Sequence, residues 1–146
     1  MSQELPLADH TTPEGVSDAT VEALGKLSEA LETTDRARGH LYSFHQLTGS
    51  ADIALGHAVT ALRDAGHAGI ADRLEQELVG RNVLAGRWTF QIVEDYDDNY
   101  WSVFRRLEQE ARQDLAGGRR HLFEARMKES ERTAGEPGHE ATPDEV

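Results

Sequence analysis

The chain has 146 residues, the length of one domain, and contains no cysteine, which excludes disulfides, zinc–thiolate sites and thiol catalysis. Its net charge of −12 disfavours binding to nucleic acid. No apolar run is long enough for a transmembrane helix, and the first residues lack the basic and apolar regions of a signal peptide. We therefore expect a soluble cytoplasmic protein with no membrane partner.

The acidity is concentrated at the two ends of the chain. Residues 1–16 carry a net charge of −3 and residues 129–146 carry −5, whereas the long middle segment carries −4. The ends also hold all four prolines and little apolar surface. We predict a disordered acidic N-terminal tail at 1–16, a helical domain at 17–130 and a disordered acidic C-terminal tail at 131–146.

The first helix is predicted to begin at Ser17 or Asp18, because both residue types are good N-caps, and to end near His45. Its inner face follows alternating spacings of three and four residues, which is typical of one side of an amphipathic helix. That face comprises Leu24, Leu27, Leu31, Thr34, Arg38, Leu41 and His45.

Two shorter helices are predicted next, after a break at Gly49. The first begins with Ser50 as its N-cap and ends before Gly66, and the second runs from Ala68 to about Val79. The connection between them is very short, so we expect a tight antiparallel hairpin.

The segment from Arg87 to Val93 precedes the last helix. Trp88, Phe90 and Ile92 alternate with Thr89, Gln91 and Val93, and this alternation indicates extended backbone. A lone strand has no ladder partner here. We interpret the segment as an extended connector that lays its aromatic side chains on the helices, unless two subunits pair their connectors.

The fourth helix is predicted to begin near Asp97 or Asp98, whose carboxylates suit a helix N-terminus, and to end near Lys128. Gly117 and Gly118 fall inside it, and each costs about 1 kcal/mol relative to alanine. The apolar pattern keeps its phase across these glycines. We therefore predict a continuous helix.

Together the elements predict an all-α fold that resembles a four-helix bundle. It would contain two long helices, a short helical hairpin and an extended aromatic connector before the last helix. The long helices would outrun the hairpin and leave apolar surface exposed at one end. We expect a homodimer to cover that surface.

Metal sites can be tested by the spacing of their ligands. A ferritin-like di-iron site needs Glu-x-x-His pairs, and no histidine of the predicted helices has a glutamate three residues before it. The acidic run from Asp95 fits the first ligand positions of an EF-hand loop, but Tyr100 replaces the required glycine and Arg106 replaces the required glutamate. We predict no metal site and no cofactor, and we interpret the acids as helix caps.

Polar residues interrupt the predicted contact faces, notably Arg38 and His45 in the first helix and Asp114 and His121 in the last. Antiparallel helices would bring the two groups together as a buried polar layer or as the lining of a small pocket. The preferred interpretation places them at the border of the contact face, because long polar side chains reach water readily.

Catalytic and nucleic-acid functions find little support. In the last predicted helix, pairs such as Glu108 and Arg112 stand at i, i+4 spacing, which indicates a solvated, salt-bridged face and not a phosphate-binding one. The serines lack a glycine-flanked nucleophile elbow, and no glycine-rich phosphate loop follows a strand. We assign no catalytic residue.

Two runs, RNVLAGRWTFQIVEDYDD at 81–98 and GGRRHLFEARMKE at 117–129, resemble segments of small actinobacterial all-helical proteins that have no assigned function. The resemblance covers the chain from about Gly39 to Glu136. It implies a cytoplasmic bacterial protein, and it brings no activity, cofactor or catalytic residue. Thirteen arginines against two lysines agree with a GC-rich genome.

The first hypothesis for function is a non-enzymatic homodimer that acts through protein contacts, with the aromatic connector at the interface. The alternative is a helical bundle, or an enzyme, that binds a small molecule or metal in a pocket with aromatic walls and polar anchors. The candidate ligand- or partner-binding residues are Arg38, His45, Trp88, Tyr96, Trp101 and His121.

Overall fold

The computed structural model describes residues 4–143, and these residues fold into helices. The elements in chain order are η1 (Ala8–His10), α1 (Asp18–Asp64), α2 (Ala68–Glu77), α3 (Thr89–Tyr96), the π-helix η2 (Asp97–Trp101), α4 (Ser102–Ala116) and α5 (Leu122–Glu131). The same stretch contains no β-strand, only an isolated bridge between Leu84 and Arg87. The all-α prediction is confirmed.

None of the helices within 4–143 has both the length and the apolar character that a membrane span requires. The predicted tails extend to residues 1–3 and 144–146, which lie outside the described part of the chain. The chain divides into two compact units, of which unit 1 comprises residues 1–33 and 103–146 and unit 2 comprises residues 34–102. Each unit is described by itself.

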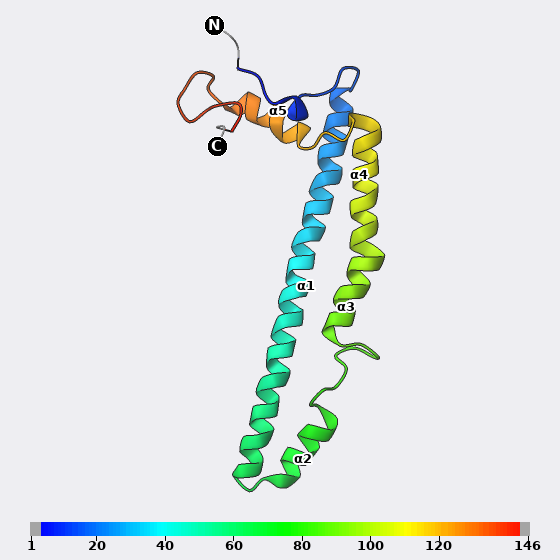
Figure 1. Ribbon diagram of the computed structural model, residues 1–146, viewed down its shortest axis with the longest axis vertical. Helices are drawn as coiled ribbons and strands as arrows, with labels where there is room; N and C mark the ends of the chain where they lie inside the picture. The colour runs from blue at the N-terminus through cyan, green and yellow to red at the C-terminus, as the bar shows by residue number, and fades with distance from the viewer. Residues whose placement is uncertain (1–3, 144–146) are drawn as a thin grey trace. The chain divides into compact units, whose positions relative to one another are not determined.

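Unit 2 contains a helical hairpin in which α2 folds back along the C-terminal part of α1 (Figure 1). The chain reverses at Gly66, whose φ of 91° is accessible to glycine at little cost, and the amide of His67 donates to the carbonyl of Leu62 at 2.8 Å. Arg63 in the last turn of α1 forms ion pairs with Asp72 and Glu75 of α2. The tight turn at Gly66 thus lies where the sequence predicts it, but the helix before it is the long α1 and not a separate short helix.

The prediction of a helix break at Gly49 is wrong, because α1 runs without interruption from Asp18 to Asp64. The less exposed face of α1 keeps alternating spacings of three and four residues through this region, where Thr48 and Asp52 continue the pattern. Gly49 lies on the exposed side of the helix, and a Cβ atom there would meet nothing within 4 Å. Since packing sustains most helices, one glycine at an open position does not end this one.

The predicted extended connector is also wrong, because Thr89–Tyr96 forms helix α3. Thr89 and Val93, four residues apart, are both buried, so the alternating apolar pattern serves a helix face. The amide of Trp88 donates to the Gln91 Oε1 atom at 2.8 Å, which satisfies a free donor at the helix start. Asp97 therefore lies inside a run of helical residues and does not cap a new helix.

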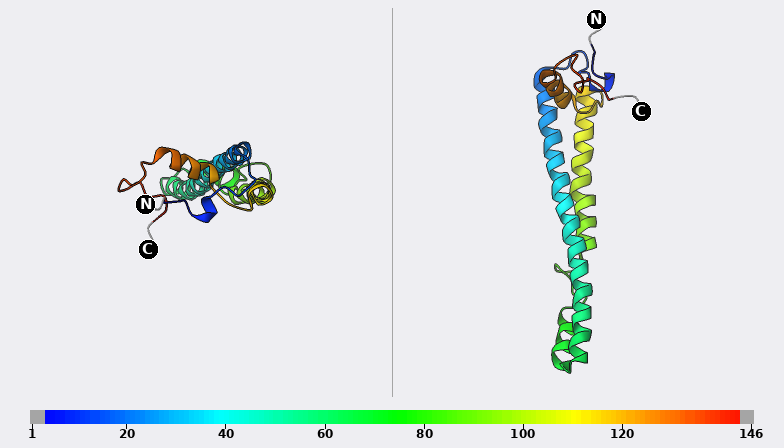
Figure 2. Two further views of the ribbon diagram at one scale, coloured as in Figure 1. Left: turned by 90° about the horizontal axis from the view of Figure 1, so that it is seen from above. Right: turned by 90° about the vertical axis from the view of Figure 1, so that its left-hand side faces the viewer.

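In unit 1, α4 lies beside the N-terminal part of α1, and α5 packs against the same end (Figures 1 and 2). The Ser17 hydroxyl accepts a hydrogen bond from the Thr20 amide at 3.1 Å, which confirms Ser17 as the predicted N-cap of α1. The apolar core consists of Val21, Ala116 and Leu122, with Val16 and Leu24 packed against it.

The prediction that the last helix continues through Gly117 and Gly118 is wrong. Helix α4 ends at Ala116, and both glycines have positive φ angles, 61° and 78°. The amide of Gly118 donates to the carbonyl of Arg112 at 3.0 Å, as in a helix C-cap that ends with a left-handed residue. Glycine adopts positive φ at little energetic cost, so two adjacent glycines favour a helix end here even though the apolar pattern continues.

Candidate functional site

The side chain of Arg38 is the centre of a cluster in unit 2. Its Nε atom donates to Asp97 Oδ1 at 2.7 Å, and its Nη2 atom donates to Asp97 Oδ2 at 3.0 Å. Helix α1 supplies Arg38, and η2 supplies Asp97. Two parallel hydrogen bonds make this the forked arginine–carboxylate geometry, which fixes the orientation of both side chains.

Two aromatic rings lie against the same guanidinium group. The Arg38 Cζ atom is 4.1 Å from the centre of the Trp101 ring and 4.9 Å from the centre of the Tyr42 ring. The Trp101 indole Nε1 atom donates to Asp35 Oδ1 at 2.6 Å, and Arg38 Nη2 donates to the Tyr42 hydroxyl at 3.3 Å. We call Asp35, Arg38, Tyr42, Asp97 and Trp101 the Arg38 cluster.

The π-helix η2 explains how Asp97 and Trp101 both reach α1. A π-helix has more residues per turn than an α-helix, and such turns are common at functional sites. In an α-helix, positions four apart overshoot one turn, and repeated spacings of four drift off the contact face. The wide turn from Asp97 to Trp101 removes this drift, so Thr89, Val93, Asp97 and Trp101 remain on one side.

The charges of the cluster are stabilised by its own contacts. The hydrogen bond from Arg38 lowers the pKa of the Asp97 carboxyl, and the same bond raises the pKa of Arg38. Burial, followed by the neighbouring Tyr100, raises the pKa of Tyr96. At neutral pH the ion pair is therefore charged and Tyr96 is neutral, a state suited to holding two helices together and unsuited to accepting a proton.

The structure brings four of the predicted site residues into two neighbouring positions of unit 2. Arg38 and Trp101 belong to the Arg38 cluster, and His45 Nδ1 lies 2.6 Å from the buried Thr89 hydroxyl. The Trp88 indole donates to the carbonyl of Gly80 at 3.2 Å. Polar side chains on the inner face of α1 are thus matched by partners within unit 2.

Tyr96 and His121, the other two predicted site residues, are placed differently. The ring of Tyr96 lies at a tilt against that of Tyr100, with 5.5 Å between ring centres and 46° between ring planes. His121 belongs to unit 1 and is exposed at the N-terminus of α5, where its φ angle is 57°. Within unit 2, Arg38 pairs with Asp97 and His45 pairs with Thr89, and in unit 1 Asp114 is exposed. Arg38 and His45 therefore do not need the alternative polar layer with Asp114 or His121 to satisfy their side chains.

His121 is nevertheless near two acids. Its Nδ1 atom is 3.8 Å from Glu124 Oε1, and ligand atoms of Glu32, His121 and Glu124 all lie within 4.8 Å of one another. Such a trio resembles a set of metal ligands. The positive end of the α5 dipole opposes a cation at this position, and the groups are largely exposed, so the trio is weak support for a metal site.

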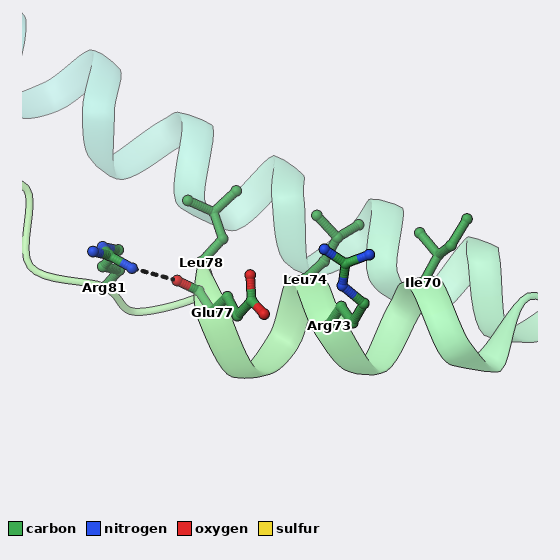
Figure 3. A pocket seen from close by; sticks show the side chains of 6 residues that line it. All are labelled: Ile70, Arg73, Leu74, Glu77, Leu78 and Arg81. Atoms are coloured by element: carbon green, nitrogen blue, oxygen red, sulfur yellow. Dashed lines mark hydrogen bonds between the residues drawn. The ribbon is translucent and has the colours of Figure 1, made fainter.

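Two grooves lie beside Leu78 and Arg81. The first, lined by α2 and the residues just after it, has a volume of about 560 Å³, and its row of Ile70, Leu74 and Leu78 is flanked by charged side chains (Figure 3). The second has a volume of about 840 Å³ and lies between α1 and the segment that joins α2 to α3. Its lining residues are Thr48, Gly49, Ala51, Asp52, Ile53, Leu55, Leu78, Arg81, Asn82, Val83, Trp88 and Thr89.

Asp35, Asp97 and Arg81 are not among the site residues that the sequence predicts. The spacing could have indicated Asp35, because it precedes Arg38 by three residues and residues three apart are neighbours on a helix surface. The partner of Arg38 lies 59 residues away in sequence and has no local signal. Comparison with protein-family models, with curated proteins and with solved structures finds no match for this chain.

Proposed function

We propose that this protein is a non-enzymatic homodimer that acts as a helical interaction module, and that α1 of unit 2 forms its interface. The single observation that carries the proposal is a second apolar stripe on α1, spaced alternately by three and four residues and exposed throughout. We call it the outer stripe: Phe44, Leu47, Ala51, Ala54, Ala58 and Ala61.

A helix with two apolar stripes is typical of a bundle in which it packs on two neighbours. The inner stripe of α1 already has intramolecular partners in unit 2, including Arg38 with Asp97 and His45 with Thr89. The outer stripe has large groups exposed to water, since Leu47 is 70% and Phe44 is 43% exposed. Removing such groups from water is the main favourable term in association.

The pattern of side-chain sizes favours a second copy of this chain as the partner. The outer stripe has its large residues at one end, Phe44 and Leu47, and only alanines at the other. Two copies related antiparallel by a two-fold axis would oppose Phe44 to Ala61 and Leu47 to Ala58. Large side chains would then fill the space above small ones, as interdigitated helix packing requires. Two hairpins joined in this way would form an intermolecular four-helix bundle, which differs from the bundle within one chain that the sequence predicts.

The proposal assigns no catalytic step. In the Arg38 cluster, the arginine is engaged by a carboxylate and two rings, and the acids are engaged by Arg38 and by the Trp101 indole. Each group therefore already has a structural partner, so the geometry supports a rigid hairpin that presents its outer surface.

The first test is the oligomeric state of the purified protein at micromolar concentration, measured by analytical ultracentrifugation. We expect a dimer for the native chain and a monomer for Leu47→Glu, because a buried unpaired charge at the interface is costly. Gln46→Glu is the matched control, since it introduces the same charge at the neighbouring exposed position outside the stripe. A native chain that sediments as a monomer would overturn the proposal.

The second test is disulfide crosslinking, for which a chain without cysteine is well suited. The antiparallel arrangement opposes residue 51 of one copy to residue 54 of the other. We expect a mixture of Ala51→Cys and Ala54→Cys chains to form mixed disulfides in preference to either homodisulfide. A parallel dimer would give the homodisulfides instead, and Thr60→Cys, outside the stripe, provides the background rate.

A further inference from the structure

We propose that the 840 Å³ groove of unit 2 binds a long-chain aliphatic carboxylate, with the carboxylate paired to Arg81 and the chain lying along the apolar walls. This inference goes beyond the proposed dimer and does not depend on it. The groove forms where α1 is covered only by the irregular segment between α2 and α3. Neither α2 nor α3 extends over this part of α1.

The size and the walls of the groove suit a small apolar ligand. Its volume falls within the roughly 300–1,000 Å³ range of small-molecule sites. Five large apolar side chains line it, from both sides: Ile53 and Leu55 from α1, and Leu78, Val83 and Trp88 from the segment beyond α2. Ile53 is 65% exposed and Val83 is 38% exposed, so an aliphatic chain would cover apolar surface that now faces water.

The charge of the groove selects the head group of the ligand. Arg81 lines both grooves, and its Nη1 atom donates to the carbonyl of Glu77 at 3.3 Å (Figure 3). Within residues 4–143 its guanidinium forms no ion pair with a carboxylate. A guanidinium group binds a carboxylate by two parallel hydrogen bonds, so an added carboxylate would complete its bonding.

The acidic residue of the groove does not compete for this role. Asp52 Oδ1 accepts a hydrogen bond from the amide of Gly80 at 3.0 Å, which ties the segment beyond α2 to α1. The carboxylate of Asp52 therefore has a structural partner. One arginine then provides the charge for one monoanionic head group, which favours a carboxylate over a phosphate ester.

Trp88 is held in the groove wall and can report occupancy. Its indole donates to the carbonyl of Gly80, and the ring is 42% exposed. An aliphatic chain beside it would replace water with an apolar environment. We expect the emission of Trp88 to shift to shorter wavelength on binding, whereas Trp101 is engaged in the Arg38 cluster and serves as background.

The experiment is isothermal titration of the whole protein with dodecanoate below its critical micelle concentration, with tryptophan emission recorded in parallel. We expect saturable binding of one dodecanoate per chain, and we expect Arg81→Gln to weaken it about tenfold. Arg36→Gln is the control, because Arg36 is an exposed arginine of α1 in the same unit that does not line the groove. Trp88→Phe should abolish the emission change, which assigns that change to Trp88.

Matched ligands separate the recognition of the head group from that of the chain. Dodecanol and dodecyltrimethylammonium carry the same chain without the negative charge, and we expect both to bind at least about tenfold more weakly. Equal binding of all three ligands, equal binding by Arg81→Gln, or no binding of dodecanoate would each overturn the inference. Repeating the titration with Leu47→Glu shows whether binding persists when the proposed dimer interface is disrupted.

Discussion

Arg38 and Asp97 form a forked ion pair whose two hydrogen bonds measure 2.7 and 3.0 Å. Both side chains are largely covered, at 27% and 22% exposure, and the pair joins α1 to η2 within unit 2. The rings of Trp101 and Tyr42 restrict the guanidinium further. This pair is better ordered than an ordinary surface salt bridge and should contribute measurably to stability.

Replacing Arg38 with glutamine should lower the free energy of unfolding by about 1–2 kcal/mol, because the ion pair and both cation–π contacts are lost. The check is urea denaturation. Arg36→Gln, an exposed neighbour on the same helix, should change stability by less than about 0.5 kcal/mol. A double-mutant cycle with Asp97→Asn should give a coupling energy of about 1 kcal/mol. A coupling energy near zero would show that the ion pair does not stabilise the protein.

The stabilisation from Asp97 should disappear in acid. Its pKa is lower in the folded state than in the unfolded chain, because the carboxylate accepts hydrogen bonds from Arg38. The contribution is therefore complete above the unfolded pKa of an aspartate, near 4, and is lost as pH falls through the lower folded pKa. Melting temperatures measured from pH 7 to pH 2 should fall less steeply for Asp97→Asn than for the native chain.

Gly25 should be intolerant of alanine. A Cβ atom at this position would lie 2.9 Å from Phe123 Cβ, an atom fixed to the backbone of α5. Helix α5 must then shift, at a cost of about 1–3 kcal/mol, which outweighs the gain of about 1 kcal/mol in helix propensity. Gly39→Ala in the same helix has open space and should stabilise. Chemical denaturation measures both, and faster amide exchange in α5 would locate the damage.

Gly49→Ala tests the continuity of α1. The position is helical and open, so we expect alanine to stabilise the protein by about 0.5–1 kcal/mol. Gly66→Ala should destabilise it, because φ at that position is 91°. Thermal unfolding followed by circular dichroism compares the two variants. If Gly49 were a hinge with non-helical backbone, its alanine variant would lose stability as well.

Local signals in the sequence predicted the parts of the fold that local chemistry decides. The hydroxyl of Ser17 caps α1, Gly66 ends it, and the inner stripe from Leu24 to His45 is the less exposed face. The break at Gly49 was wrong because the stripe continues through polar residues, Thr48 and Asp52. A search for apolar residues at helical spacing misses such polar positions, although they lie on the same face of the helix.

The prediction of an extended aromatic connector is wrong for a different reason. In a run as short as 87–93, apolar residues on both sides of an alternating pattern fit a strand and a helix equally well. The bond between Gln91 and the amide of Trp88, and the buried pair Thr89 and Val93, decide for the helix. At the candidate site, the helical spacing predicts Arg38 as a polar residue on the contact face. The sequence predicts a helix cap for its partner Asp97, because sequence position does not show which distant side chain a carboxylate meets.

The division into two units has a consequence for the order of folding. Unit 2 is one continuous segment, whereas unit 1 is assembled from two segments, so its contacts span long distances in sequence: Ser28 and Glu108 are 80 residues apart, and Glu4 and Arg132 are 128 apart. The entropy of closing a loop must be overcome before such contacts form. Once Trp101 has bonded to Asp35 in unit 2, most of that loop is already closed. We therefore expect unit 2 to fold first and, by shortening the loop between them, to make the pairing of the two segments of unit 1 easier.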